Sequence, residues 1–167
     1  MLRVRGNIWE EQRRRAGSLV VVPTNIGWAG EDGHNVMGAG IALQAKRKLP
    51  LLPSWYGHFC KKHGENTPVA QYMTLLLFPV KPLNKGKPWL SWRSPADLEL
   101  IARSAEQLAA YRLDGLYNSE GTAPQVLLPL VGCGNGGLDP VDVLPRLDRY
   151  LTEERFVLVI RPEETKL

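Results

Sequence analysis

Residues 126–138 have the sequence VLLPLVGCGNGGL, in which an apolar run passes directly into a glycine-rich turn. Asp139-Pro140 follows and favours a helix start, because Asp caps helix N-termini and Pro suits the first helical turn. Glycines let backbone N–H groups approach an anion closely, and a helix N-terminus adds partial positive charge. The stretch therefore predicts a buried strand, a phosphate-binding turn and a helix.

A second stretch, Met37-Gly38-Ala39-Gly40-Ile41-Ala42, repeats this arrangement at the predicted start of another helix. Two such turns indicate a ligand with two phosphates, such as a dinucleotide or a nucleotide-sugar. The stretch lacks the third glycine of the dinucleotide-binding fingerprint, and the chain contains no Gly-Lys-Ser/Thr. The two common nucleotide-binding motifs are thereby excluded.

Short apolar runs alternate along the chain with helical patterns. Strands are predicted over residues 2–5, 19–22, 73–78, 126–131 and 156–160, and helices over residues 38–49, 53–63, 94–109 and 139–151. Pro23 and Pro79 are expected to end their strands, Ser94 to cap its helix, and Trp55 to face inward. The alternation predicts an α/β fold, a three-layer α-β-α sandwich with a central mixed, largely parallel sheet.

Ligands in such folds bind beyond the carboxyl ends of the strands. Both glycine-rich turns and the irregular residues 80–93 follow strand ends, so we expect them to meet at one crevice. Residues 115–125 are predicted to form another loop, and the tail after Arg161 is expected to be frayed. Glu163-Glu164 is expected to be solvated charge.

The bulk properties bound the class of protein. A length of 167 residues favours a single domain, residues 1–167 with a core over about 3–160, and 44% hydrophobic residues suffice to bury that core. The sequence contains no apolar run long enough to predict a membrane span, and its first residues do not resemble a secretory signal. Two cysteines, Cys60 and Cys133, make no disulfide framework. We expect a cytoplasmic monomer without membrane contact.

Basic residues suggest two surfaces that could meet an anionic partner. Arg13-Arg14-Arg15 is one, and the other is the segment in which Lys81, Lys85 and Lys87 precede Trp89 and Trp92. Interleaved basic and aromatic residues are typical of single-stranded nucleic-acid binding, whereas isolated basic runs are commonly solvated surface charge. Both alternatives remain open for each surface.

Metal and thiol chemistry have weak signals. His58, Cys60 and His63 share one predicted helix without a fourth ligand, whereas a structural zinc needs four converging ligands. Cys133 lies at a predicted helix N-terminus, but no histidine base follows nearby, which favours a packing role. We therefore predict no metal and no redox cofactor.

Three segments together resemble the macro domain, a module that binds ADP-ribose. They are Val20-Val21-Val22-Pro23-Thr24-Asn25, Met37-Gly38-Ala39-Gly40-Ile41-Ala42-Leu43-Gln44-Ala45-Lys46 and residues 128–138. The resemblance extends over roughly residues 3–160. The two glycine segments are most similar to the branch that contains the terminal ADP-ribose protein glycohydrolase and the antitoxins that remove ADP-ribose from thymidine in DNA.

In that branch a lysine after the middle strand attacks the anomeric carbon C1″ of the distal ribose or assists its cleavage. Phe78-Pro79-Val80-Lys81 resembles the family segment Phe-Pro-Thr-Lys, so the resemblance implies that Lys81 is catalytic. A lysine becomes nucleophilic when desolvation or nearby cations, such as Lys85 and Lys87, lower its pKa. A lysine in a basic loop is otherwise a solvated charge.

The resemblance also implies a set of residues that bind ADP-ribose. They are Asn7, Ile8, Asn25, Asn35, Met37, Gly38, Ala39, Gly40, Ile41, Gly132, Cys133, Gly134, Asn135, Gly136, Gly137 and Leu138. Asn7 takes the place of an acid that accepts from the adenine amino group, and it keeps an acceptor without the charge. Asn25 and Asn35 either orient the distal ribose or stabilise turns.

One departure from the family pattern bears on the substrate. The protein-directed glycohydrolase has a catalytic aspartate where this chain has Gly136, and Asp139 suits a helix cap. The chain therefore resembles the DNA-directed antitoxins more closely. The implied function is an ADP-ribosyl glycohydrolase acting on DNA or protein. The alternatives are a non-catalytic ADP-ribose reader or scavenger, an ADP-ribose 1″-phosphate phosphatase, and a nucleic-acid-binding protein.

Overall fold

The computed structural model describes residues 1–113, 121 and 123–164. The elements follow the order β1 (Leu2–Arg5), α1 (Ile8–Arg14), β2 (Leu19–Asn25), α2 (Gly40–Lys48), α3 (Leu52–His63), η1 (Gly64–Asn66), β3 (Ala70–Tyr72), β4 (Leu75–Lys81), η2 (Pro88–Arg93), α4 (Leu98–Ala109), β5 (Val126–Leu128), α5 (Pro140–Tyr150) and β6 (Phe156–Ile160). The predicted loop over residues 115–125 lies mostly outside the described residues.

Six strands form one sheet in the order β1-β6-β5-β2-β4-β3. Every neighbouring pair is parallel except β3 and β4, which are antiparallel. The carboxyl ends of five strands therefore meet at the same edge of the sheet. This mixed, largely parallel sheet confirms the predicted fold class.

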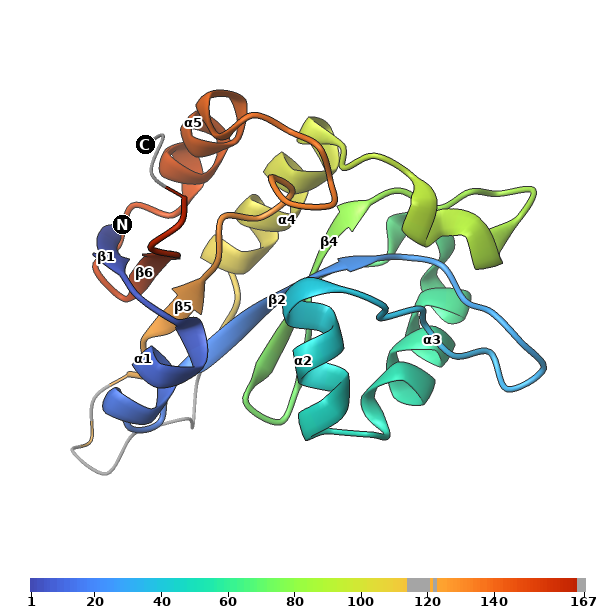
Figure 1. The fold of residues 1–167 in the computed structure, drawn as a ribbon, viewed down its shortest axis with the longest axis horizontal. Helices are drawn as coiled ribbons and strands as arrows, with labels where there is room; N and C mark the ends of the chain where they lie inside the picture. The colour runs from blue at the N-terminus through green and yellow to red at the C-terminus, as the bar shows by residue number, and fades with distance from the viewer. Residues whose placement is uncertain (114–120, 122, 165–167) are drawn as a thin grey trace.

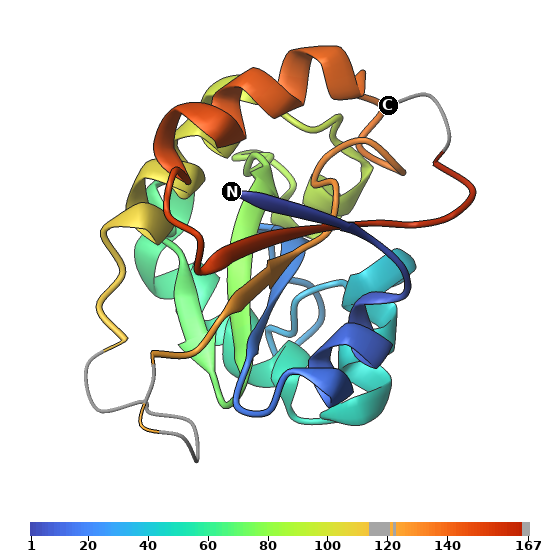
Figure 2. The same ribbon diagram turned by 90° about the vertical axis from the view of Figure 1, so that its left-hand side faces the viewer.

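Helices cover both faces of the sheet, as Figures 1 and 2 show. Along β2, Val20 and Val22 pack in the cluster formed with α1, α2 and α3, whereas Leu19 and Val21 pack in the cluster formed with α4 and α5. Successive strand side chains point to opposite faces, so a strand buried on both sides has no polar alternation. The continuous apolar run in β2 has this cause, and the three layers are confirmed.

Two neighbouring strands, β2 and β4, continue through the prolines that were expected to end them. β2 runs through Pro23 to Asn25, and β4 runs through Pro79 to Lys81. On one side of each extension the neighbouring strand has already ended, because β5 pairs only with Leu19 and Val20, and β3 pairs only as far as Leu77. A proline, which cannot donate, is tolerated where one side has no partner. The extension of β4 carries Lys81 to the sheet edge.

The hairpin of β3 and β4 was not predicted. The expected strand over residues 73–78 begins at Leu75, because Met73 adopts φ 53° in the turn that joins the two strands. Gln71 Nε2 donates to the Met73 carbonyl at 2.9 Å and supports this turn. β3 has only three residues, which is too short for a visible alternation.

Helix α1 was also missed, although its ends carry recognisable signals. Asn7 caps it, with Oδ1 accepting from Trp9 N at 2.9 Å and from Glu10 N at 3.3 Å. Acidic residues occupy the first turn and basic residues the last, as the helix dipole favours. Arg14 and Arg15 pair with Glu11 at 2.8 and 3.1 Å. Two of the three consecutive arginines thus serve the fold.

Three further expectations need correction. Asp97, rather than Ser94, caps α4, and its Oδ1 accepts from Leu100 N at 2.7 Å, because Ser94 and Pro95 form a linker ahead of the helix. β5 ends at Leu128 instead of Val131, since Pro129 follows. Trp55 is 36% exposed and stacks on Phe59 instead of entering the core. Across the described residues, no helix has the length and apolar character needed to cross a bilayer.

Candidate functional site

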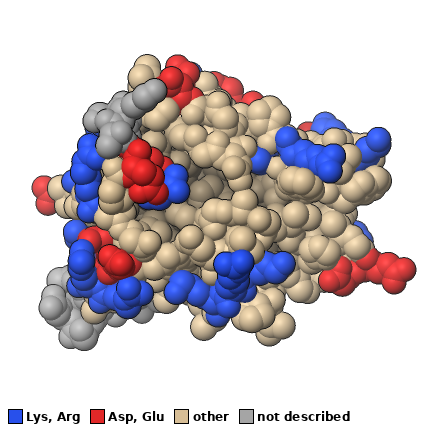
Figure 3. All heavy atoms as spheres, in the orientation of Figure 1, with Lys and Arg blue, Asp and Glu red and all other residues tan. Residues whose placement is uncertain are grey.

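The carboxyl edge of the sheet opens into one cavity of about 1110 Å³. Figure 3 looks onto this face, where the hollow at the centre has mostly uncharged walls. Its lining includes most of the predicted site residues: Asn7, Ile8, Asn25, Asn35, Met37, Gly38, Ala39, Gly40, Ile41, Lys81, Gly132, Gly134, Asn135 and Gly136. The topology therefore brings segments far apart in the sequence to a single site.

The strand order fixes how these segments follow one another along the edge. Asn7 follows β1 and Arg161 follows β6, then come the turn after β5, the turn after β2, and Lys81 at the end of β4. Neighbouring strands lie about 4.8 Å apart, so β6 and β4, three spacings apart, are separated by roughly 14 Å. The two glycine-rich turns lie between these ends.

The first glycine-rich turn, residues 37–42, leads into the N-terminus of α2, where no side chain caps the helix. Ala39 is the N-cap and offers no side-chain hydrogen bond, and the first N–H bonded within the helix is that of Leu43, which donates to the Ala39 carbonyl at 3.1 Å. The preceding N–H groups line the cavity without a partner in the helix. An added Cβ at Gly38 would meet nothing within 4 Å, so the cavity reaches its backbone. This helix end is suited to an anion.

The second turn is a compact loop that only glycine can form at its narrowest point. A Cβ on Gly136 would lie 2.3 Å from the Gly132 carbonyl oxygen, whereas Gly134 has open space above it. The loop is closed by Gly137 N donating to Gly134 O at 3.0 Å and by Leu138 N donating to Gly132 O at 3.1 Å. Among the described residues, the N–H groups of residues 134–136 make no recorded hydrogen bond and remain available to a ligand.

Three predicted residues of the second turn lie outside the cavity lining, and their part in binding stays a prediction. They are Cys133, Gly137 and Leu138. Burial raises the pKa of the Cys133 thiol to about 11, so a thiolate is disfavoured at neutral pH. The Leu138 side chain packs beneath Gly132.

The N-terminus of α5 differs from that of α2. Asp139 caps it through Oδ1, which accepts from Val141 N at 2.9 Å. A carboxylate already compensates the positive end of this helix, so it does not complete the second phosphate site in the way expected from the sequence. The groups that this turn presents to the cavity are therefore the loop N–H groups and not the end of α5.

Lys81 is the last residue of β4 and lies at one end of the cavity. It lies opposite Asn25 in the sheet register, and its Nζ donates to the Trp92 carbonyl at 2.8 Å. Partial burial lowers the pKa of Lys81 below its ordinary value, because desolvation penalises the ammonium form. Lys85 pairs with Glu65 at 2.7 Å, so it is not the unpaired neighbouring cation that was expected.

The two asparagines beside Lys81 are used largely by the fold. Asn25 Nδ2 donates to Val36 O at 2.8 Å, and its Oδ1 accepts from Gly27 N and from Asn35 Nδ2 at 3.0 and 3.1 Å. Asn35 Nδ2 also donates to Gly27 O at 2.8 Å. Both therefore stabilise the turn after β2. The Oδ1 atom of Asn35 is buried without a recorded partner in the described residues, and it is the free acceptor here.

At the other end of the cavity, the acceptor expected of Asn7 is occupied. Its Oδ1 receives the two N–H groups at the start of α1, so the atoms left for a ligand are the Nδ2 donors. Ile8, next to it, is buried and gives this end an apolar wall.

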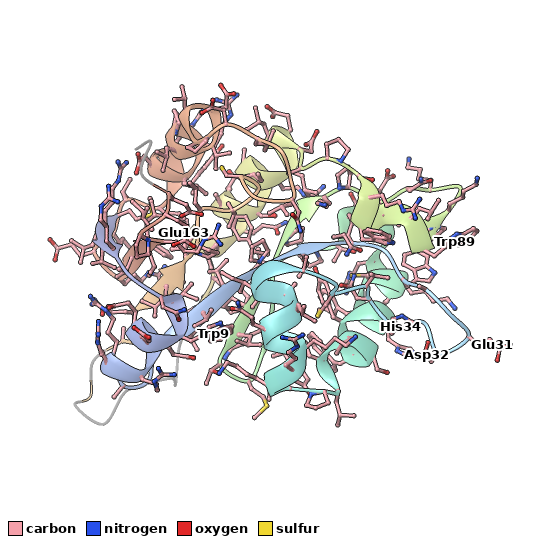
Figure 4. All side chains as sticks on the ribbon, in the orientation of Figure 1. Trp9, Glu31, Asp32, His34, Trp89 and Glu163 are labelled. Atoms are coloured by element: carbon pink, nitrogen blue, oxygen red, sulfur yellow. The ribbon has the colours of Figure 1, made fainter. Side chains whose placement is uncertain are left out.

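A charged pair that was not predicted from the sequence also lies at this end of the cavity. Arg161 donates through Nη2 to Glu164 Oε1 at 2.8 Å, and both residues line the cavity. Figure 4 labels the adjacent Glu163. The position of Arg161 directly after β6 was the available signal, because side chains that follow parallel strands meet at the binding edge.

The other chemical signals have structural explanations. His58 Nδ1 lies 2.7 Å from the Ser54 carbonyl, and His63 packs against Phe59. Burial raises the pKa of the Cys60 thiol to about 12. Within the part of the chain that the structure describes, no three His, Cys, Asp or Glu side chains are grouped so as to hold a metal.

Known proteins were found that resemble this chain in fold and sequence, although no family model matches the sequence. The macrodomain of Mycobacterium tuberculosis DarG superposes with a TM-score of 0.65 at 28% identity, covering 96% of each chain. The chain belongs to the macro-domain family. The macrodomain of Thermus aquaticus DarG superposes with a TM-score of 0.62 at 26% identity, also covering 96% of both chains.

The curated proteins that share sequence with this macro domain include two that are named DNA ADP-ribosyl glycohydrolase. The one from Mycobacterium tuberculosis is 33% identical over 123 residues, 67% of this chain and 30% of its own length. The one from Thermus aquaticus is 29% identical over 161 residues, 90% of this chain and 38% of its own. The macro domain thus spans less than two fifths of these relatives.

A structure described as Thermosipho africanus DarTG in complex with ADP-ribose has the same fold. Its TM-score is 0.68 at 22% identity, and the match covers 100% of this chain and 43% of that one. That match shows the fold, and the two DarG macrodomains and the curated relatives place this macro domain in the DarG branch of the family.

Proposed function

We propose that this macro domain binds ADP-ribose along the carboxyl edge of its sheet and hydrolyses the bond that joins ADP-ribose to DNA. The observation that carries the proposal is the order of groups along that edge. A donor-rich end at Asn7 is followed by two sets of free backbone N–H groups and then by Lys81. ADP-ribose has the matching order of base, diphosphate and distal ribose.

The diphosphate is assigned to the middle of the cavity. The uncapped N-terminus of α2 faces it from one side and the loop of residues 132–137 from the other. Open space above Gly38 and Gly134 lets phosphate oxygens reach the backbone. Backbone donors held by the fold bind an anion without ordering side chains.

Lys81 is assigned to the anomeric carbon C1″. In its neutral form Nζ attacks C1″, the bond from C1″ to the base nitrogen breaks, and that nitrogen leaves with the electron pair and takes the proton that Nζ loses. Water then replaces Nζ at C1″, which releases ADP-ribose and restores the amine. Burial favours this role because it lowers the pKa of Lys81 and so raises the fraction of neutral amine.

DNA is the proposed carrier of the ADP-ribosyl group for two reasons. The relatives with similar sequence are named for DNA. The chain also lacks the loop aspartate of the protein-directed enzymes, and the crowded backbone around Gly136 leaves no room for a side chain there. Among the described residues that line the cavity, Glu164 is the only carboxylate, and it is paired with Arg161 at the far end.

The test is release of free ADP-ribose from an oligonucleotide ADP-ribosylated on thymidine, compared with a protein ADP-ribosylated on a carboxylate. We expect turnover of the DNA substrate, loss of at least 100-fold in kcat for Lys81→Ala, and little turnover of the protein. Equal turnover by wild type and Lys81→Ala would remove the lysine mechanism.

A second candidate is a reader that binds ADP-ribose without turnover. The observation in its favour is the hydrogen bond that Lys81 Nζ already makes to the Trp92 carbonyl, which holds the amine as a donor. Calorimetry separates the candidates, because a reader binds ADP-ribose tightly and releases no product in the hydrolysis assay.

A further inference from the structure

Two exposed tryptophans lie on one face of a short helix beside the cavity. η2 (Pro88–Arg93) is a 3₁₀ helix, in which residues three apart eclipse one another at a rise of about 2.0 Å per residue. Trp89 and Trp92 are three apart, so their side chains leave the same face roughly 6 Å apart. Trp89 is 51% exposed and Trp92 is 41% exposed.

η2 is packed against the end of the sheet. Ser91 is fully buried, and its Oγ accepts from Asn84 N at 2.9 Å. Gly27, just beyond β2, lies so close that an added Cβ would be 2.1 Å from the Pro88 carbonyl oxygen. The backbone that carries the two indoles is therefore held in place, which reduces the entropy cost of stacking a ligand on them.

Two basic residues flank the indoles in η2. Lys87 immediately precedes η2, and the Arg93 guanidinium lies 4.9 Å from the Trp92 ring centroid. Figure 3 shows blue Lys and Arg atoms over this end of the molecule, and Figure 4 places Trp89 above the separate loop that carries Glu31 and Asp32. A positive surface with aromatic rings suits a polyanion with flat bases, which single-stranded nucleic acid is.

This face continues directly into the cavity. Trp92 and Arg93 line the cavity, whereas Trp89 lies outside the lining, and the Trp92 carbonyl accepts the hydrogen bond from Lys81. A strand attached to the distal ribose at Lys81 would thus leave the cavity over η2. We propose that Trp89 and Trp92 stack the bases of single-stranded DNA that flank the modified nucleotide, a role that rests on the proposed function.

The test uses Trp89→Ala, which leaves the cavity lining intact, and measures three quantities. They are the affinity for an unmodified ten-nucleotide single strand, kcat/KM on an ADP-ribosylated oligonucleotide, and the affinity for free ADP-ribose. Because one stacked base contributes substantially to binding, we expect the first two to fall about tenfold and the third to stay constant. Trp89→Tyr should retain most of the binding. Trp55→Ala, which removes an exposed tryptophan on α3, should change none of the three.

Several outcomes would overturn the proposal. Wild type that binds ADP-ribose but not the single strand would contradict the platform and leave the proposed function standing. Two results would show that the strand is held by charge alone and not by stacking. One is an unchanged oligonucleotide affinity in Trp89→Ala, and the other is displacement of the strand by inorganic polyphosphate at equal charge concentration. Strand binding that depends on Trp89 without any ADP-ribose binding would instead remove the proposed function and keep the platform.

Discussion

Lys81 combines two conditions that a nucleophilic amine requires. It is positioned, because the end of β4 fixes its backbone and the Trp92 carbonyl orients Nζ at 2.8 Å. It is also partly desolvated, which lowers its pKa from the ordinary value of 10.5. An electrostatic role would need the ammonium form, which the same burial disfavours.

The pH dependence of the single-turnover rate distinguishes these roles. A nucleophilic Lys81 loses activity as pH falls below its lowered pKa, so the rate should rise with pH and level off below pH 10.5. Lys85→Ala, which removes an exposed lysine paired with Glu65, should give the same profile as wild type. A single-turnover rate that falls as the pH rises towards 10.5 would show instead that Lys81 acts as an ammonium ion that stabilises charge.

Asn7 has a role in the fold and also lines the cavity. Its Oδ1 caps α1, which leaves donors towards the cavity. Asp is an equally good N-cap and would add a second acceptor oxygen. We therefore predict that Asn7→Asp raises the affinity for ADP-ribose several-fold in calorimetry without lowering the melting temperature.

The control for this substitution is Asn7→Ala, which removes the cap and should destabilise the protein by about 1 kcal/mol. An unchanged or weaker affinity in Asn7→Asp would show that the adenine amino group does not meet residue 7.

At the scale of the elements, the two glycine-rich turns do different work. α2 presents an uncapped helix end, whereas the loop of residues 132–137 uses its own N–H groups because Asp139 occupies the end of α5. We predict that Gly38→Val lowers ADP-ribose affinity at least tenfold, since its side chain fills the open space at the first turn. Gly86→Val, in an exposed loop outside the lining, should leave that affinity unchanged.

Thermal unfolding checks that Gly38→Val acts on the ligand. Its melting temperature should stay close to that of wild type, because no neighbour lies within 4 Å of the added Cβ. Wild-type affinity in the folded Gly38→Val variant would exclude a phosphate at this turn.

η2 couples the end of β2 to Lys81. A Cβ on Gly27 would overlap the Pro88 carbonyl at 2.1 Å and the Ser91 side chain at 2.6 Å, so Gly27→Ala must displace η2. We predict a loss of about 1–3 kcal/mol in unfolding free energy and a larger loss in kcat than in ADP-ribose affinity. Equal losses in both would show that Lys81 does not depend on the position of η2.

The sequence was most informative where local pattern decides structure. The apolar runs predicted β2 and β6, and Asp139-Pro140 predicted the start of α5. It was less informative where the pairing of strands determines their ends. No local pattern shows that β5 and β3 end early, which is why Pro23 and Pro79 can stay in strands. The Arg161–Glu164 pair was missed for a similar reason, since only strand order brings it to the cavity.

At the scale of the whole molecule, the two faces of the sheet carry the apolar core, and its carboxyl edge carries the cavity. Apolar clusters fill both faces, so the helices on either side stabilise the sheet. Of the described helices, only the start of α1, the first part of α2 and the end of η2 line the cavity. The binding groups collect at one edge because five strands are parallel and end together. The loops that follow β1, β5 and β2 and the end of β4 therefore line one cavity, which a ligand of the length of ADP-ribose would span under the proposed function.

The most direct test of this account is a titration of the isotopically labelled protein with ADP-ribose, followed through backbone amide resonances. The account predicts large, saturable shifts for Gly38 to Ile41 and for Gly134 to Gly136 together, with smaller shifts at Asn7 and Lys81. Saturation with neither turn affected would contradict a diphosphate held between them.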